Sequence, residues 1–114
     1  MPRPKTKEER VYQARLIKKL RIVFEDCFIL KNDSKYLQGV PDLLLLWRDK
    51  WAILEVKRKR PTSASDFEPN QEYYLEKLNE MSFAACIYPE NEVEVIDALQ
   101  QAFGLRRATR SAKR

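Results

Sequence analysis

The chain has 114 residues, of which 44% are hydrophobic and 34% charged, and its formal net charge is +5. This composition predicts one small globular domain with a real core, and no run of about 18 apolar residues offers a membrane span. There is no histidine, which excludes histidine general bases, Ser-His-Asp triads and most zinc sites. Any catalysis would depend on carboxylates, lysine, tyrosine or a hard metal ion.

The charge is distributed unevenly along the chain. Residues 1–60 contain 16 Lys/Arg and 8 Asp/Glu (net +8), residues 61–104 contain 1 and 9 (net −8), and residues 105–114 contain 5 and none (net +5). A basic half and a basic tail suit a polyanion such as nucleic acid, although the tail is equally well explained as a solvated end. We expect one domain over residues 1–104 and a disordered basic tail over 105–114.

Two features bear on the cellular compartment. The first ten residues, MPRPKTKEER, are charged from the start and do not have the pattern of a secretory signal. Cys27 and Cys86 lie far apart and form no CxxC motif, which favours reduced cysteines. The sequence therefore predicts a cytoplasmic protein.

The predicted elements alternate between helices and short strands. Apolar residues recur at helical spacing over 7–24, and a helix is also predicted from near Pro69 to about Met81 and again over 91–103, where Gly104 ends it. Strands are predicted over 27–31, 41–47, 51–57 and 83–89, and the middle two form an antiparallel hairpin. The order α-β-β-β-α-β-α predicts an α/β (α+β) fold with a mixed central sheet flanked by helices.

The hairpin contains two acids where apolar residues are expected. Because side chains alternate along a strand, Glu55 and Lys57 share one face, and so do Asp42 and Leu44. With an even-numbered loop, Asp49-Lys50 or 48–51, Asp42 would pair opposite Lys57, and the two acids would be diagonal neighbours on one face. A three-residue loop would separate them unless a bulge corrected it.

Two carboxylates that converge in apolar surroundings need a cation between them. Carboxylate oxygens suit Mg²⁺ or Mn²⁺, and the ammonium of Lys57 beside such an ion could orient a water or hold a phosphate oxygen. The pattern therefore favours metal-assisted hydrolysis of a phosphodiester. The plain alternative is a capping Asp42 and an ordinary surface pair of Glu55 and Lys57, but the surrounding strands are too hydrophobic to suit a solvated face.

Polar residues on the inward faces of two helices add to this pattern. Gln71 precedes apolar residues by one turn, and Glu9 lies at the polar start of the first helix's apolar stripe. A polar residue on an apolar face usually has a partner. We expect Gln71 to bond lysine, water or phosphate and Glu9 to be an outer metal ligand, with capping or surface roles as the alternative and Glu8 as the other acid that could join the site.

The sequence resembles the PD-(D/E)XK nucleases over roughly residues 8–103. Pro41-Asp42 is followed thirteen residues on by Glu55-Val56-Lys57, and with Gly39-Val40-Pro41-Asp42 and Gln71 it looks like the VRR-NUC branch, which includes small phage endonucleases described as Holliday-junction-resolvase-like. The resemblance implies a single nuclease-like domain with Mg²⁺ or Mn²⁺ held by Asp42, Glu55, the Val56 carbonyl and Glu9. It implies that Asp42, Glu55, Lys57 and Gln71 carry the catalysis.

The leading hypothesis is a structure-specific DNA endonuclease that cuts branched, junction or flap DNA in phage recombination or processing. The resemblance implies a homodimer and, if the protein is phage-encoded, a place in the host-cell cytoplasm. The absence of a long apolar run predicts no membrane association. Basic residues would hold the DNA backbone without reading bases, namely Lys31, Lys35, Arg58, Lys59 and Arg60.

Two other functions remain open at this point. A non-catalytic nucleic-acid-binding module derived from a nuclease fold would bind DNA in a salt-dependent way that does not depend on metal. A structural domain with a basic tail would lose its DNA affinity when residues 105–114 are deleted.

Overall fold

The computed structural model describes residues 5–32 and 36–105, so the predicted tail lies outside the described residues except for its first position. The elements follow one another as α1 (Lys7–Val23), β1 (Phe28–Lys31), β2 (Leu43–Trp47), β3 (Lys50–Val56), α2 (Gln71–Met81), β4 (Phe83–Ile87) and α3 (Glu92–Ala102). Short 3₁₀ turns at Ala64–Asp66 and Pro89–Asn91 are additional to the predicted elements. The predicted fold class and element order are confirmed.

The helix ends follow from local chemistry. Thr6 caps α1 through a capping box with Glu9, in which the Thr6 hydroxyl accepts from the Glu9 N–H and the Glu9 carboxylate accepts from the Thr6 N–H. The second helix, predicted to start near Pro69, begins two residues later at Gln71, because Asn70 adopts a left-handed conformation (φ 72°). Gly104 takes a positive φ of 76° just after α3, as expected of a helix end.

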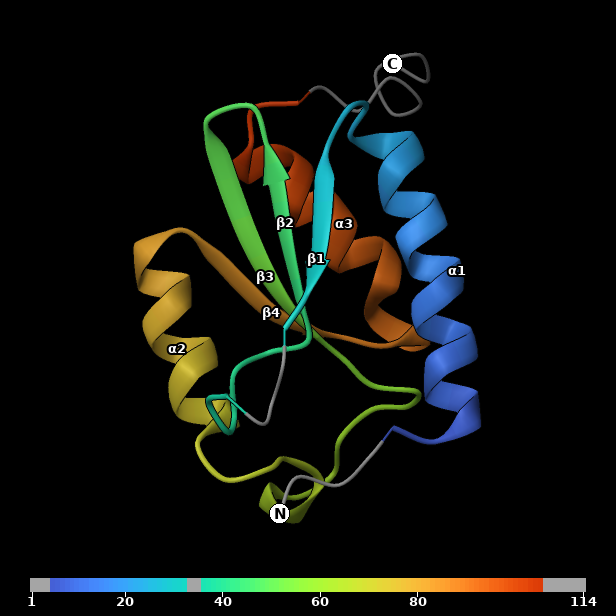
Figure 1. The fold of residues 1–114 in the computed structure, drawn as a ribbon, viewed down its shortest axis with the longest axis vertical. Coiled ribbons are helices and arrows are strands. Elements are labelled where there is room, and N and C mark those ends of the chain that lie inside the picture. Colours follow the sequence, from blue (N-terminus) through green and yellow to red (C-terminus); the bar gives the residue numbers. More distant parts are fainter. Residues whose placement is uncertain (1–4, 33–35, 106–114) are drawn as a thin grey trace.

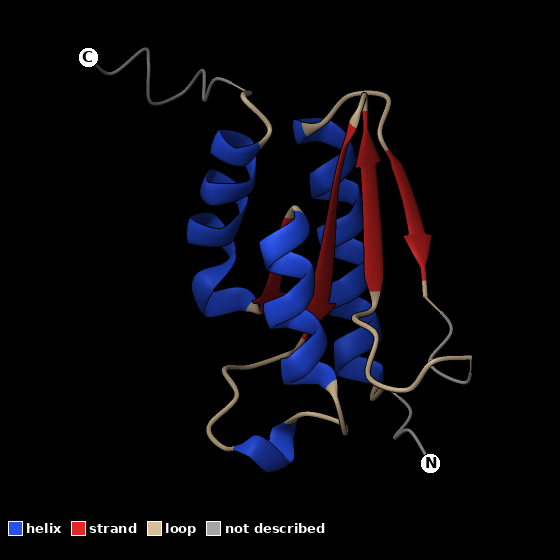
Figure 2. Ribbon diagram, turned by 90° about the vertical axis from the view of Figure 1, so that its left-hand side faces the viewer, coloured by secondary structure: helices blue, strands red, loops and turns tan. Residues whose placement is uncertain are grey.

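The four strands form one sheet in the order β1-β2-β3-β4. The first three strands are antiparallel, whereas β4 runs parallel to β3 after a crossover through α2. Figure 1 shows α2 beside one face of the sheet and α1 beside the other, with α3 behind the strands. In the turned view of Figure 2, α2 lies in front of the sheet and α1 behind it.

The core lies between the sheet and the pair α1 and α3. Alternate residues of β2 and β3 face it, and the buried cluster consists of Tyr12, Leu16, Leu20, Phe24, Leu43, Leu45, Trp47, Ala52, Leu54, Val56, Ile87, Ile96, Leu99 and Phe103. On the opposite face the buried apolar residues are fewer, with Ile53 and Ala84 paired across β3 and β4. Burial of the first face is the main driving force for this fold.

The core ends in an aromatic cluster at the hairpin turn. Phe24 packs edge-on against Trp47 and against Phe103, with ring centroids 5.5 Å apart in both pairs, and the Trp47 and Phe103 rings stack at 5.9 Å. The Trp47 indole N–H donates to the Glu25 carbonyl at 3.0 Å. These contacts fix the turn end of the sheet through apolar packing.

Candidate metal centre

The hairpin register places the two acids side by side. Trp47 pairs with Lys50, so the turn consists of Arg48 and Asp49, and the predicted pairing of Asp42 with Lys57 is wrong by two residues. Arg48 has a positive φ of 58°, which allows a turn this short to close. Leu43 pairs with Leu54, so the same register continued by one residue brings Asp42 opposite Glu55. A shift of two residues preserves the alternation of side chains, so both acids stay on one face.

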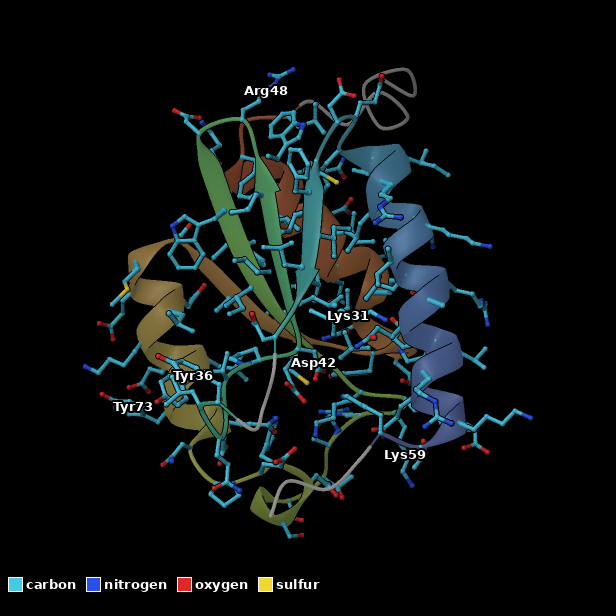
Figure 3. The ribbon with its side chains drawn as sticks, viewed as in Figure 1. Lys31, Tyr36, Asp42, Arg48, Lys59 and Tyr73 are labelled. Carbon is cyan, nitrogen blue, oxygen red and sulfur yellow. The ribbon has the colours of Figure 1, made fainter. Side chains whose placement is uncertain are left out.

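Asp42 is held at the end of β2 by hydrogen bonds on both sides. Its carbonyl accepts from the Asn32 N–H at 2.8 Å, which extends the β1–β2 ladder. Its Oδ2 accepts from the Val56 N–H at 2.9 Å. The Asn32 side-chain amide donates to the carbonyl of Pro41 at 2.6 Å. The carboxylate is thereby fixed against the last residues of β3 at the lower end of the sheet, where Figure 3 places it between the starts of α1 and α2.

Glu55 is the buried acid of the pair. Its side chain is 1% exposed, and its Oε2 lies 3.4 Å from Nζ of Lys57. Its second oxygen, Oε1, is buried and has no hydrogen-bond partner among the described residues. Burial, together with repulsion from Asp42, raises the pKa of the Glu55 carboxyl to about 7, while the charges of Lys5 and Lys57 act in the opposite direction. A carboxylate in such surroundings is stable only beside a cation.

Lys5 supplies that cation, and sequence reasoning missed it. Its Nζ lies 2.7 Å from Asp42 Oδ2 and 3.6 Å from Glu55 Oε2, and it donates to the Val56 carbonyl. Burial alone would lower the pKa of the Lys5 ammonium, but the charges of Asp42 and Glu55 outweigh it and the pKa is raised. The only sequence signal was another lysine near the first helix, which is indistinguishable from the other basic residues there.

Lys57 is positioned by the loop that follows it. Its Nζ donates to the Asp66 carbonyl at 2.9 Å and lies 5.4 Å from the centroid of the Phe67 ring. The Asp66 carboxylate closes this loop by accepting from the N–H groups of Thr62 at 2.7 Å and Ser63 at 3.2 Å, and these bonds lower the pKa of Asp66. The 3₁₀ turn therefore holds the ammonium beside Glu55 rather than leaving it free in solvent.

Gln71 is buried at the start of α2, but its side chain forms a hydrogen bond with the nearby main chain rather than with the acids. Its side chain is 3% exposed, and its Oε1 accepts from the Glu68 N–H at 2.9 Å. Gly39, at φ 95°, packs against this start, since a Cβ there would lie 2.4 Å from the Pro69 carbonyl oxygen. The structure thus brings the loop before Asp42 and the start of α2 together, without a hydrogen bond from Gln71 to either acid or to Lys57.

The other predicted site residues lie farther from the acids. Glu9 uses its carboxylate in the capping box of α1, and Glu8 is exposed on the first turn of that helix. Lys31 is exposed at the end of β1, and Lys35 lies outside the described residues. Of the predicted set, the structure therefore gathers Asp42, Glu55, the Val56 carbonyl and Lys57 and adds Lys5.

An open pocket next to Lys57 is lined in part by basic side chains. The pocket has a volume of about 350 Å³ and is lined by Thr6, Glu9, Lys57, Arg58, Lys59, Arg60, Pro61 and Asp66. Figure 3 shows Lys59 on the same lower end of the molecule as Asp42, toward α1. A pocket rimmed by consecutive cations attracts anions such as phosphates.

The two cysteines are free, as predicted. Cys86 pairs with Glu55 in the β3–β4 register, and burial, with a contribution from the charge of Glu55, raises the pKa of its thiol to about 12. Burial also raises the pKa of the Cys27 thiol. Both groups are therefore neutral, weakly nucleophilic thiols.

The donor set fits a hard divalent cation. Asp42 Oδ2, Glu55 Oε2 and the Val56 carbonyl already converge on one ammonium, and the buried Glu55 Oε1 lacks a partner. Within residues 5–32 and 36–105, no three His, Cys, Asp or Glu side chains cluster as a metal site. The protein would thus give two carboxylates and one carbonyl, and water the remaining ligands, as is common for Mg²⁺.

Comparison with known proteins gives no match to a family model, to a curated protein or to a solved structure. In the part of the chain that the structure describes, no helix has the length and apolar character needed to span a membrane.

Proposed function

We propose that the chain is a DNA endonuclease of the PD-(D/E)XK kind that requires Mg²⁺ or Mn²⁺ and hydrolyses phosphodiester bonds. The observation that carries this proposal is the convergence of Asp42, Glu55 and the Val56 carbonyl on one cation, with Lys57 3.4 Å from Glu55. The preference for branched, junction or flap DNA rests on the sequence resemblance, as does the homodimer.

In this proposal, each residue of the site has a separate chemical role. A divalent cation bound by Asp42, Glu55 and the Val56 carbonyl would supply Lewis-acid polarisation of the phosphate and activation of a water. Lys57, held by the Asp66 carbonyl, presents a fixed ammonium to the attacking water or to the charge that develops on the phosphate. The Asp42 side chain is tied to the Val56 N–H, so both ligand-bearing strand ends keep their geometry without the metal.

The basic pocket supports DNA as the substrate. Arg58, Lys59 and Arg60 are exposed and directly follow Lys57, so a strand whose phosphate lies at the acids would pass along them. Such contacts neutralise phosphates without reading bases. We therefore expect binding to weaken steeply with salt and to be nearly independent of sequence.

One observation favours a second candidate, a non-catalytic DNA-binding module. Lys5 neutralises both acids without any metal, which is what a nuclease site that had lost its cation would require. This candidate predicts that DNA binding is unaffected by EDTA and that no metal supports cleavage.

The test compares cleavage of a four-way junction, a flap and a plain duplex in Mg²⁺, Mn²⁺ or EDTA. Lys57→Ala is expected to lower the cleavage rate by about a hundredfold or more, because an electrostatic group at the reacting phosphate is lost. Lys77→Ala, which removes an exposed lysine of α2, is the control and should leave the rate unchanged. Equal rates for the two variants, or no metal-dependent cleavage of any substrate by the wild type, would contradict the proposal.

A further inference from the structure

Lys5 occupies the position that the metal would need. Its ammonium lies 2.7 Å from Asp42 Oδ2 and 3.6 Å from Glu55 Oε2, and it also bonds the Val56 carbonyl. These are the three oxygen groups that the proposed function assigns to the cation. Mg²⁺ binds oxygen ligands at about 2.0–2.1 Å, so an ion on these oxygens and the Lys5 ammonium would overlap.

We propose that Lys5 is an internal counter-ion of the site: it pairs with Asp42 and Glu55 when no divalent cation is bound, and the cation displaces it on binding. This inference rests on the proposed function in so far as it assumes that the two acids bind a metal. It adds that metal binding is a competition with a residue of the same chain.

The site needs such a counter-ion. Glu55 is 1% exposed and Asp42 lies across from it, so two carboxylates without a cation would repel each other with little solvent to screen them. Lys57 alone does not suffice, since its Nζ is shared with the Asp66 carbonyl and forms its ion pair with Glu55 rather than with Asp42. Among the residues that the structure describes, Lys5 is the cation that contacts both acids.

The position of Lys5 allows it to leave. It precedes Thr6, the N-cap of α1, and its main-chain carbonyl accepts from Arg10 Nη1 at 2.7 Å. The capping box therefore anchors the backbone, while the Lys5 side chain, 24% exposed, has solvent on one side. Displacement requires rotation about side-chain bonds rather than movement of an element.

Competition weakens the apparent affinity for the metal. When only a fraction of molecules has the site free, the apparent dissociation constant rises by the inverse of that fraction. If Lys5 holds the site in about nine molecules of ten, its removal tightens metal binding about tenfold. The lysine would then keep the enzyme inactive at low metal concentration and leave the acids neutralised.

The first experiment titrates Mn²⁺ into the full-length wild type and into Lys5→Met, and follows free Mn²⁺ by electron paramagnetic resonance. We expect Lys5→Met to bind Mn²⁺ about tenfold more tightly. Lys7→Met is the matched control, because it removes the same charge from an exposed position on the first turn of α1 without contact to the acids. It should change the affinity less than twofold or so, by long-range electrostatics alone.

The second experiment uses only the wild type and needs no variant to fold. Reductive methylation of lysines, read by mass spectrometry, is compared with and without saturating Mn²⁺. Lys5 should become several times more reactive when Mn²⁺ is present, while Lys7 and Lys77 react equally in both states.

The results of the two experiments distinguish failure of the Lys5 counter-ion from failure of the metal site itself. Tighter binding by Lys5→Met together with metal-dependent exposure of Lys5 supports the counter-ion. Equal affinity in Lys5→Met and Lys7→Met, or unchanged Lys5 reactivity at saturating Mn²⁺, overturns it and leaves the metal site standing. No Mn²⁺ binding in either protein overturns the metal site and the counter-ion together.

Discussion

The two ends of the β2–β3 hairpin carry the same kinds of charged residue in opposite settings. At the turn, Asp49 and Lys50 form an ion pair of 3.0 Å with the Asp49 side chain 85% exposed. At the open end, Asp42, Glu55, Lys5 and Lys57 form a cluster in which Glu55 is 1% exposed. Exposed pairs of the first kind contribute little to stability, whereas buried charges cost solvation that only precise partners offset.

The two ends of the hairpin therefore differ in the interactions that hold them. Hydrophobic packing supports the turn end, where Trp47 stacks with Phe103 beside Phe24 and the charges are incidental. The open end keeps charges in a place where apolar residues would be more stable, and one oxygen of Glu55 there has no partner among the described residues. Such an arrangement is typical of a binding site for a cation rather than of a structural contact.

The largest change in stability should come from the turn end. Phe24→Ala removes the ring that packs against both Trp47 and Phe103, and it should lower the free energy of unfolding by about 3–5 kcal/mol. Denaturant unfolding followed by tryptophan fluorescence measures this loss. A loss below about 1 kcal/mol would mean that apolar packing does not hold this end of the hairpin.

At the open end we expect a smaller change in the free energy of unfolding, and a gain rather than a loss. Because the folded protein raises the pKa of Glu55 from 4.5 to about 7, its charged form destabilises the fold. In EDTA at about pH 8, Glu55→Gln should therefore raise the free energy of unfolding by about 1 kcal/mol while it abolishes metal binding. Denaturant unfolding and the Mn²⁺ titration check the two effects.

The stability gained by Glu55→Gln should depend on pH. A carboxyl whose pKa is raised on folding favours the folded state while protonated, and this contribution is lost as the pH rises from 4.5 through about 7. The gain from Glu55→Gln should thus shrink toward zero at about pH 5. Asp49→Asn, the matched control at the turn, should show no such gain at either pH, because exposed ion pairs contribute little to stability. An equal gain in Asp49→Asn would mean that burial of the charge at the open end is not the cause.

Much of the fold could be predicted from the sequence because its elements are marked by local patterns. The helical spacing of Leu16 and Leu20 and the apolar runs of the hairpin gave the correct order of elements. The predicted register of the hairpin was wrong by two residues. Arginine rarely adopts a positive φ, so nothing in the sequence indicated that Arg48 begins the turn. The error did not move Asp42 and Glu55 to different faces, since two residues is one full period of a strand.

The candidate site was only partly visible in the sequence. Asp42, Glu55 and Lys57 stand out because they interrupt apolar strands, and the structure brings them together. Lys5 could not be identified, because its role depends on how the segment before α1 lies across the ends of β2 and β3. Glu9 and Gln71 instead make local bonds, each with a residue three positions earlier: Glu9 caps its own helix with Thr6, and Gln71 accepts from the Glu68 main chain.

The most direct test of the account compares Asp42→Asn with Asp49→Asn in metal-dependent DNA cleavage. Both variants remove one negative charge from the same hairpin, but only Asp42 lies at the proposed metal position. Asp42→Asn should abolish cleavage in Mg²⁺ and Mn²⁺ and preserve or tighten DNA binding, because a negative charge leaves the phosphate site, whereas Asp49→Asn should cleave like the wild type. Undiminished cleavage by Asp42→Asn, or an equal loss in both variants, would contradict the assignment of the open end as a metal-dependent nuclease site.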